Sequence, residues 1–73
     1  MKAKIMLYNK EDDKIITRIF DWAEEVQIFD KVKNEIDYSF VSDLSVFDNQ
    51  IIIDGKYFDI VNMLSKNKFE DEV

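Results

Sequence analysis

The absence of both cysteine and histidine from a chain of 73 residues is the feature that most constrains its fold. A domain this short buries only about 60% of the surface that its unfolded chain exposes, so small domains often need disulfides or a structural metal. Disulfides require cysteine, and structural zinc requires cysteine or histidine. We therefore expect one hydrophobic core, supported by the pairing of two copies into a homodimer.

The composition indicates a folded domain without a membrane segment. Hydrophobic residues make up 47% of the chain and aromatic residues 14%, more than intrinsically disordered chains contain. The basic start of the chain is not followed by the long apolar run of a signal peptide, and no apolar run is long enough to span a bilayer. We expect a cytoplasmic protein with a compact domain over residues 1–64 and a frayed acidic tail over 65–73.

Two segments show the patterns of β-hairpins. Residues 2–8 and 14–20 alternate between apolar and polar side chains around a polar turn, which predicts two paired strands. Further along, residues 50–53 and 56–61 flank an Asp-Gly pair. That pair favours the left-handed backbone of a type I′ turn, and Gly55 is the only glycine in the chain.

The segment between these hairpins carries the signals of a helix. Asp21 is suited to cap a helix, with Glu24 at the third helical position as in a capping box. Apolar residues then follow at steps of four, three, three and four, which places them on one helical face: Trp22, Val26, Phe29, Val32 and Ile36. The alternative is a short strand over residues 26–29. The segment 38–47 mixes apolar residues with serines and has no clear assignment.

Together these patterns predict an α+β domain. We expect roughly four strands, arranged as hairpins in a mainly antiparallel sheet, with one helix packed across one face. We expect Trp22, Phe29 and Phe40 to belong to the core.

The residue types needed for catalysis are missing. An activated nucleophile usually needs a histidine base, and the chain has none. A single glycine cannot build a phosphate-cradling loop, and the acids of residues 9–13 do not have the spacing of a calcium loop. We expect a protein that is not an enzyme and that holds no cofactor and no metal.

The charge balance directs attention to basic partners. Sixteen acidic against ten basic residues give a net charge of −6 and a pI near 4.4, which argues against direct binding to nucleic acid or anionic membranes. Acidic surfaces attract basic ones, although net charge also serves solubility alone. The basic residues Lys2, Lys4, Lys10 and Lys14 gather near the first predicted hairpin. There they protect a sheet edge or, alternatively, pair with the acidic half of a second copy.

Acidic residues form a string in the middle of the chain. No basic residue lies between Lys33 and Lys56, whereas acids recur throughout that stretch. Such unpaired acids are what a surface would need to resemble the repeated charges of DNA, although a solvated surface would also contain them. The candidate phosphate-mimicking residues are Glu24, Glu25, Asp30, Glu35, Asp37, Asp43, Asp48 and Asp54.

In general character the chain resembles the early host-takeover proteins of phages that infect low-GC Gram-positive bacteria. The likeness rests on the short, acidic, cysteine-free sequence and on the stretch 48–62 with its predicted hairpin. Several such proteins mimic DNA and block host targets, including HU-type nucleoid proteins and the sliding clamp.

We therefore expect a dimeric DNA mimic that occupies the basic DNA-binding surface of a host protein, with an HU-type nucleoid protein favoured. The first alternative is an adaptor or inhibitor that binds a target such as the sliding clamp through a sheet edge or aromatic face. In that case the acids serve only solubility. The second alternative is a structural subunit without inhibitory function.

Overall fold

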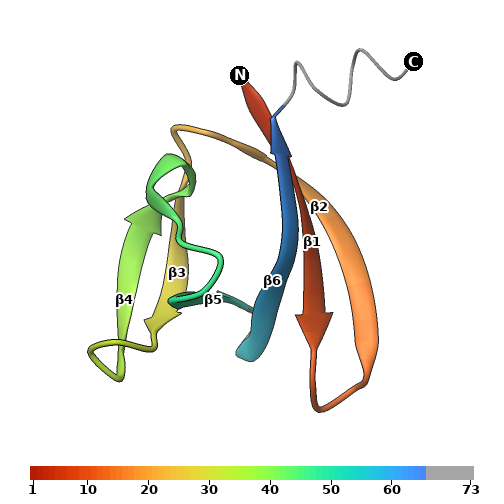
Figure 1. The fold of residues 1–73 in the computed structure, drawn as a ribbon, viewed down its shortest axis with the longest axis vertical. Coiled ribbons are helices and arrows are strands. Elements are labelled where there is room, and N and C mark those ends of the chain that lie inside the picture. The colour runs from red at the N-terminus through yellow and green to blue at the C-terminus, as the bar shows by residue number, and fades with distance from the viewer. Residues whose placement is uncertain (66–73) are drawn as a thin grey trace.

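The computed structural model describes residues 1–65, and these form one open antiparallel sheet (Figure 1). The six strands have the spatial order β2-β1-β6-β5-β3-β4, and a single 3-10 turn, η1 (Val41–Asp43), follows β4. The tail expected over 65–73 lies outside the described residues, apart from Ser65 at the end of β6. The strands are β1 (Lys2–Asn9), β2 (Lys14–Asp21), β3 (Glu25–Asp30), β4 (Glu35–Phe40), β5 (Asn49–Ile53) and β6 (Lys56–Ser65).

The α+β prediction is wrong. No α-helix occurs within residues 1–65, and the segment expected to form one provides the end of β2, all of β3 and the start of β4. The alternative of a strand over residues 26–29 is confirmed, because these residues lie inside β3. All four pair with β4, and Ile28 and Phe29 also pair with β5.

The capping signal at Asp21 and Glu24 exists in the structure, but it closes a turn. The Asp21 carboxylate accepts a hydrogen bond from the Ala23 amide at 3.1 Å, and the Glu24 carboxylate accepts one from the Asp21 amide at 3.2 Å. Both bonds are local, so they form equally well whether a helix or a strand follows. The chain becomes extended at Glu25.

Two of the residues whose spacing predicted the helix are exposed and do not lie in the core. Val32 is 74% exposed in the β3–β4 turn and Ile36 is 52% exposed on β4, whereas Ile28, off the predicted helical face, is 4% exposed. Within β3, Val26 and Ile28 lie on the core side, as the alternation of a strand requires. Residues with branched or aromatic side chains pack well on a pleated surface, which favours this solution.

Both predicted hairpins are confirmed. Strand β1 pairs with β2 up to the Asn9–Lys14 pair, and β5 pairs with β6 up to the Ile53–Lys56 pair. In the second turn Asp54 and Gly55 have φ values of 51° and 77°, the left-handed pair that a type I′ turn requires.

The core lies on the inner face of the curled sheet. Strand β1 contributes three fully buried side chains, those of Ala3, Ile5 and Leu7. The remaining core residues come from the other strands and from the segment around η1: Phe20, Ile28, Val41, Leu44, Ile51, Phe58 and Ile60.

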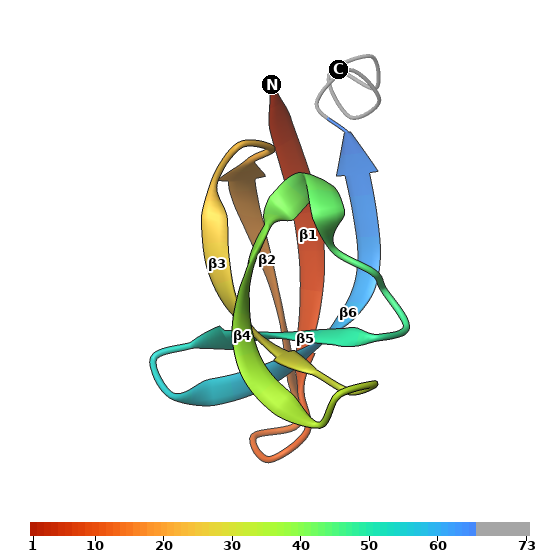
Figure 2. The ribbon, with the colours of Figure 1, turned by 90° about the vertical axis from the view of Figure 1, so that its left-hand side faces the viewer.

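Two residues of the segment 38–47, which the sequence left without an assignment, cover one end of this core. Val41 is fully buried, and Leu44 is 9% exposed. The Val41 amide donates a hydrogen bond to the Glu24 carbonyl at 2.8 Å, which ties η1 to the β2–β3 turn. Figure 2 shows the loop of η1 at the same end of the molecule as the end of β2 and the start of β3. Val41 and Leu44 thus cover one end of the core, and no helix packs across a face of the sheet within residues 1–65.

Replacement of Gly55 by alanine tests the type I′ turn. A Cβ at Gly55 would meet no atom within 4 Å, so the cost comes only from the left-handed backbone, at about 1 kcal/mol. Gly55→Asn should lose less, because asparagine tolerates this conformation. Urea unfolding monitored by Trp22 fluorescence measures both. Equal losses for the two variants would contradict this assignment.

Candidate functional site

The net negative charge of the protein arises from the middle of the chain. Residues 24–54 contain eight acidic residues and two lysines, whereas the rest of the chain contains eight acidic and eight basic residues. The whole net charge of −6 is therefore carried by residues 24–54, which include β3, β4 and β5. We call this segment the acidic half.

Three of the candidate acids lie where η1 meets the β2–β3 turn. Glu25 begins β3 directly opposite Phe40, the last residue of β4. Glu24 precedes it and binds Val41 through its carbonyl, and Asp43 ends η1. All three are exposed. This group, Glu24, Glu25 and Asp43, forms the first acidic cluster.

Three further acids gather at the other end of the β3–β4 hairpin. Asp30 lies opposite Glu35 across the turn, and the Asp48 carbonyl accepts a hydrogen bond from the Lys31 amide at 2.8 Å. This turn also carries Lys33, and the Lys31 ammonium lies 3.7 Å from the Asp59 carboxylate. The stretch without basic residues in the sequence is therefore not free of them in space.

The last two candidate acids have different surroundings. Asp37 lies between the clusters on β4, and its carboxylate accepts a hydrogen bond from the Tyr38 amide at 2.8 Å. Asp54 lies in the β5–β6 turn, which Figure 2 shows on the opposite side from the β3–β4 turn. The fold thus brings seven candidates to the β3–β4 hairpin and its flanks and places Asp54 apart from them.

The outward face of β4 is apolar, which the sequence reading missed. Ile36, Tyr38 and Phe40 are 52%, 61% and 49% exposed, so Phe40 does not belong to the core as expected. On the same face Phe29 meets Tyr57 edge to face, with ring centroids 5.8 Å apart. The signal that could have revealed this face is the strict alternation over residues 35–40, with acids at 35 and 37 and apolar side chains at 36, 38 and 40.

Strand β2 is the opposite edge of the sheet and has the opposite charge. Its outward face carries Ile15 and Ile19, which are 59% and 62% exposed. Its inward face carries Lys14 and Arg18, because these residues pair with the core-facing residues of β1. Both edges of the sheet therefore combine exposed apolar side chains with charge.

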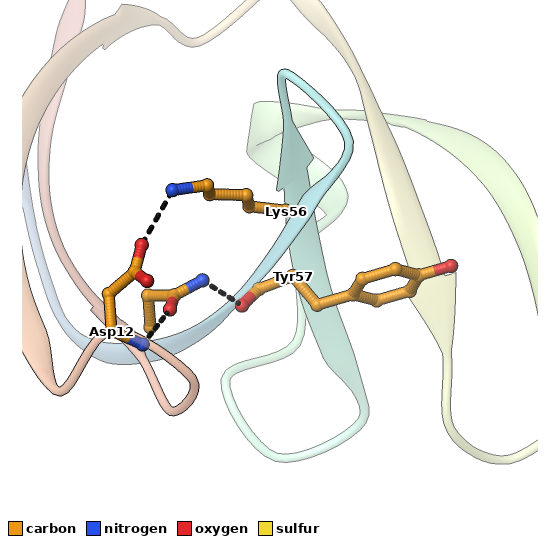
Figure 3. Close-up of polar contacts among 4 residues, drawn as sticks. Asp12, Lys56 and Tyr57 are labelled. Carbon is orange, nitrogen blue, oxygen red and sulfur yellow. Dashed lines mark hydrogen bonds and ion pairs between the residues drawn. The ribbon is translucent and has the colours of Figure 1, made fainter.

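A polar clamp connects the β1–β2 turn with the β5–β6 hairpin (Figure 3). The Lys56 ammonium lies 2.6 Å from the Asp12 carboxylate, and the hydrogen bond between them lowers the pKa of Asp12 and raises the pKa of Lys56. Asn9 is 3% exposed; its side chain donates to the Tyr57 carbonyl at 3.3 Å and accepts from the Asp12 amide at 2.7 Å.

Two small hollows lie on the surface of residues 1–65. Hollows of about 90 Å³ and 200 Å³ lie on the outer face of β1 and beside the β1–β2 turn, well below the roughly 300 Å³ at which small-molecule sites begin. Within residues 1–65, no cluster of three or more acidic residues has the geometry to hold a metal ion. In this part of the chain no helix has the length and apolarity to cross a membrane.

Comparison of the chain with known protein families, with characterised proteins and with solved structures finds no match. The geometry of the acidic half and of the two sheet edges is therefore the basis for a functional proposal.

Replacement of Asp12 by asparagine tests the clamp through its pH dependence. Because the pKa of Asp12 is lowered in the folded protein, its stabilisation is present above the unfolded value near 3.9 and is lost as the pH falls through the folded value. The pKa of Lys56 is raised in the folded protein. The stabilisation that depends on its charge is therefore present below the unfolded pKa of lysine and is lost as the pH rises through the folded pKa of Lys56.

Asp12→Asn should therefore destabilise the protein between about pH 4 and pH 10, and the difference from wild type should vanish below this window. Urea midpoints across the pH range measure the effect. Glu25→Gln, which removes a carboxylate remote from Lys56, is the matched control. A loss that persists undiminished at pH 2 would show that Asp12 acts otherwise.

Proposed function

We propose that this protein is a non-enzymatic binding protein whose acidic half occupies the basic surface of another protein. The favoured target is the DNA-binding surface of a host protein such as an HU-type nucleoid protein, in the cytoplasm of the host cell. The acids would then take the positions of DNA phosphates. The observation that supports this most directly is the confinement of the entire net charge to residues 24–54.

Three of the acids, Asp30, Glu35 and Asp37, lie on the inner side of the β3–β4 hairpin, whereas Glu25 pairs with Phe40 on the outward side. The two clusters lie at opposite ends of the β3–β4 hairpin, and Asp37 lies between them. Along β4, Glu35 and Asp37 are separated by two residues, which corresponds to about 7 Å. Successive phosphates of one DNA strand rise by about 3.4 Å along the helix axis. Because they also turn around that axis, their direct separation is longer than this rise, so the two acids would take the places of neighbouring phosphates.

Some of the candidate carboxylates are held within the chain and others are not. Four accept hydrogen bonds from nearby amide or hydroxyl groups, namely those of Glu24, Asp30, Asp37 and Asp48. Glu25 and Asp43 are exposed, and neither forms a side-chain hydrogen bond or an ion pair with any other residue of the described part. Unpaired surface acids remain available to cations of a partner, and they steer its approach over a distance of about one Debye length.

The double variant Glu25→Gln, Asp43→Asn tests the acidic half. We expect binding to a purified HU-type nucleoid protein to weaken by about tenfold, since each exposed ion pair contributes up to about 1 kcal/mol. The matched control is Glu11→Gln, Asp13→Asn in the β1–β2 turn. It removes the same charge from the other half, and asparagine tolerates the left-handed backbone of Asp13.

Binding of the wild type should also fall steeply between about 50 and 200 mM salt and should be displaced by duplex DNA. Failure to bind the nucleoid protein at low salt, or binding that duplex DNA does not displace, would contradict the proposed target. Equal losses for the two double variants would show that net charge, not the acidic half, determines affinity.

A second candidate function is binding through a sheet edge. It is favoured by the exposed apolar row Ile36, Tyr38 and Phe40 on a strand that pairs on one side only. Free strand edges recruit further strands through main-chain hydrogen bonds, and neighbouring side chains supply specificity. Here β4 would be the binding element, and the acids would select a partner with basic side chains.

A further inference from the structure

The two ends of the sheet are free edges of opposite character. Strand β2 pairs only with β1, and β4 pairs only with β3, and Figure 1 shows the two edge strands on opposite sides of the molecule. Proteins protect such edges with proline, bulges, short strands or charged side chains, including charges that point inward. This chain contains no proline, and its edge strands have eight and six residues.

The charges at the two edges oppose pairing between like edges. Two copies of β2 side by side would bring the cations Lys14 and Arg18 of both copies together, and two copies of β4 would do the same with Glu35 and Asp37. Like charges across adjacent strands are destabilising, whereas opposite charges stabilise the pair. Only β2 of one copy against β4 of another combines opposite charges.

Strand direction permits this pairing. All neighbouring strands in the sheet are antiparallel, so with six strands β2 and β4 run in opposite directions along the sheet. Strand β4 of a second copy therefore continues the antiparallel alternation beside β2, with the apolar faces of both copies on the same side. The charged side chains of both edge strands then lie together on the inner side.

One register forms an ion pair and apolar contacts at the same time. With Arg18 opposite Asp37, the same antiparallel register places Ile19 opposite Ile36, which buries two exposed apolar side chains against each other. Within residues 1–65 Arg18 has no ion-pair partner, and neither has Asp37. The remaining outward pairs of this register are Thr17 with Tyr38 and Ile15 with Phe40.

We propose that the chain associates head to tail, with edge strand β2 of one copy adding to edge strand β4 of the next. This inference rests on the second candidate function, binding through a sheet edge, and names a second copy of the chain as the partner that pairs with β4. It does not depend on the proposed binding of a basic host protein. Because the interface joins two different surfaces, it leaves a free edge at each end of a pair. The assembly therefore grows into rings or filaments and does not stop at a symmetric dimer.

Charge reversal of the full-length chain tests this pairing. Wild type should show an average mass that rises with concentration and falls with salt in analytical ultracentrifugation. Arg18→Glu and Asp37→Arg should each weaken association by at least about tenfold, because each places like charges face to face. The double variant, Arg18→Glu with Asp37→Arg, should restore association, because its two edges are again complementary.

Two controls separate this pairing from general charge effects. Lys10→Glu and Asp43→Arg make the same charge changes away from the edge strands and should leave the association unchanged. Circular dichroism should show the same sheet content for every variant, since Arg18 and Asp37 are both exposed. Asp43→Arg should still weaken binding to the nucleoid protein, so failure of one proposal is distinguishable from failure of the other.

Three results would overturn the inference. The first is a monomer at every concentration. The second is a dimer that depends on only one edge, which would indicate pairing between like edges. The third is a double variant that restores thermal stability without restoring mass, which would show that β2 and β4 of a single chain close on each other.

Discussion

Burial of the inner face of one curled sheet is the constraint on which the rest of the structure depends. No helix within residues 1–65 covers that face, so the strands must cover it themselves. Strand β1 makes this possible, because its alternation places three fully buried side chains, Ala3, Ile5 and Leu7, between β2 and β6. Val41 and Leu44 then close one end of the core, held by backbone hydrogen bonds to the β2–β3 turn. A core of this kind uses only apolar residues and needs neither cysteine nor histidine.

The same fold leaves the sheet with two exposed edges, and these two edges carry opposite charges. The N-terminal hairpin presents cations at its free edge, and the acidic half presents carboxylates at the other. The proposed self-association and the proposed binding of a basic protein would therefore use the same asymmetry of charge. They use different residues, because Glu35 and Asp37 lie on the free strand, whereas Glu24, Glu25 and Asp43 lie at the turn near η1. A partner that contacts Glu35 and Asp37 would compete with self-association. A partner that contacts only the first acidic cluster would not.

The two correctly predicted hairpins and the wrongly predicted helix show which features local sequence patterns can predict. Alternation over residues 2–8 and the Asp54-Gly55 pair are short-range signals, and the backbone they predict is the one observed. The capping residues Asp21 and Glu24 are equally short-range, and their hydrogen bonds also form. What they could not specify is the conformation after the turn. That choice depends on whether Ile28 or Val32 reaches the core, and the core is assembled from strands distant in sequence. The candidate acids could be selected from the sequence as a proposal, but their division into two clusters could not be predicted from it.

The sequence by itself determined that this chain has no disulfide and no histidine chemistry, that it carries an excess of acids in its middle, and that two hairpins form around defined turns. Only the tertiary structure decided that residues 25–30 form a strand in place of a helix, because pairing of β3 with both β4 and β5 satisfies backbone groups that a helix would have satisfied internally. It also decided that Lys31 and Lys33 lie among the acids, and that β2 and β4 are edges. Strand order is set by contacts between residues far apart in the chain, so local patterns do not contain it.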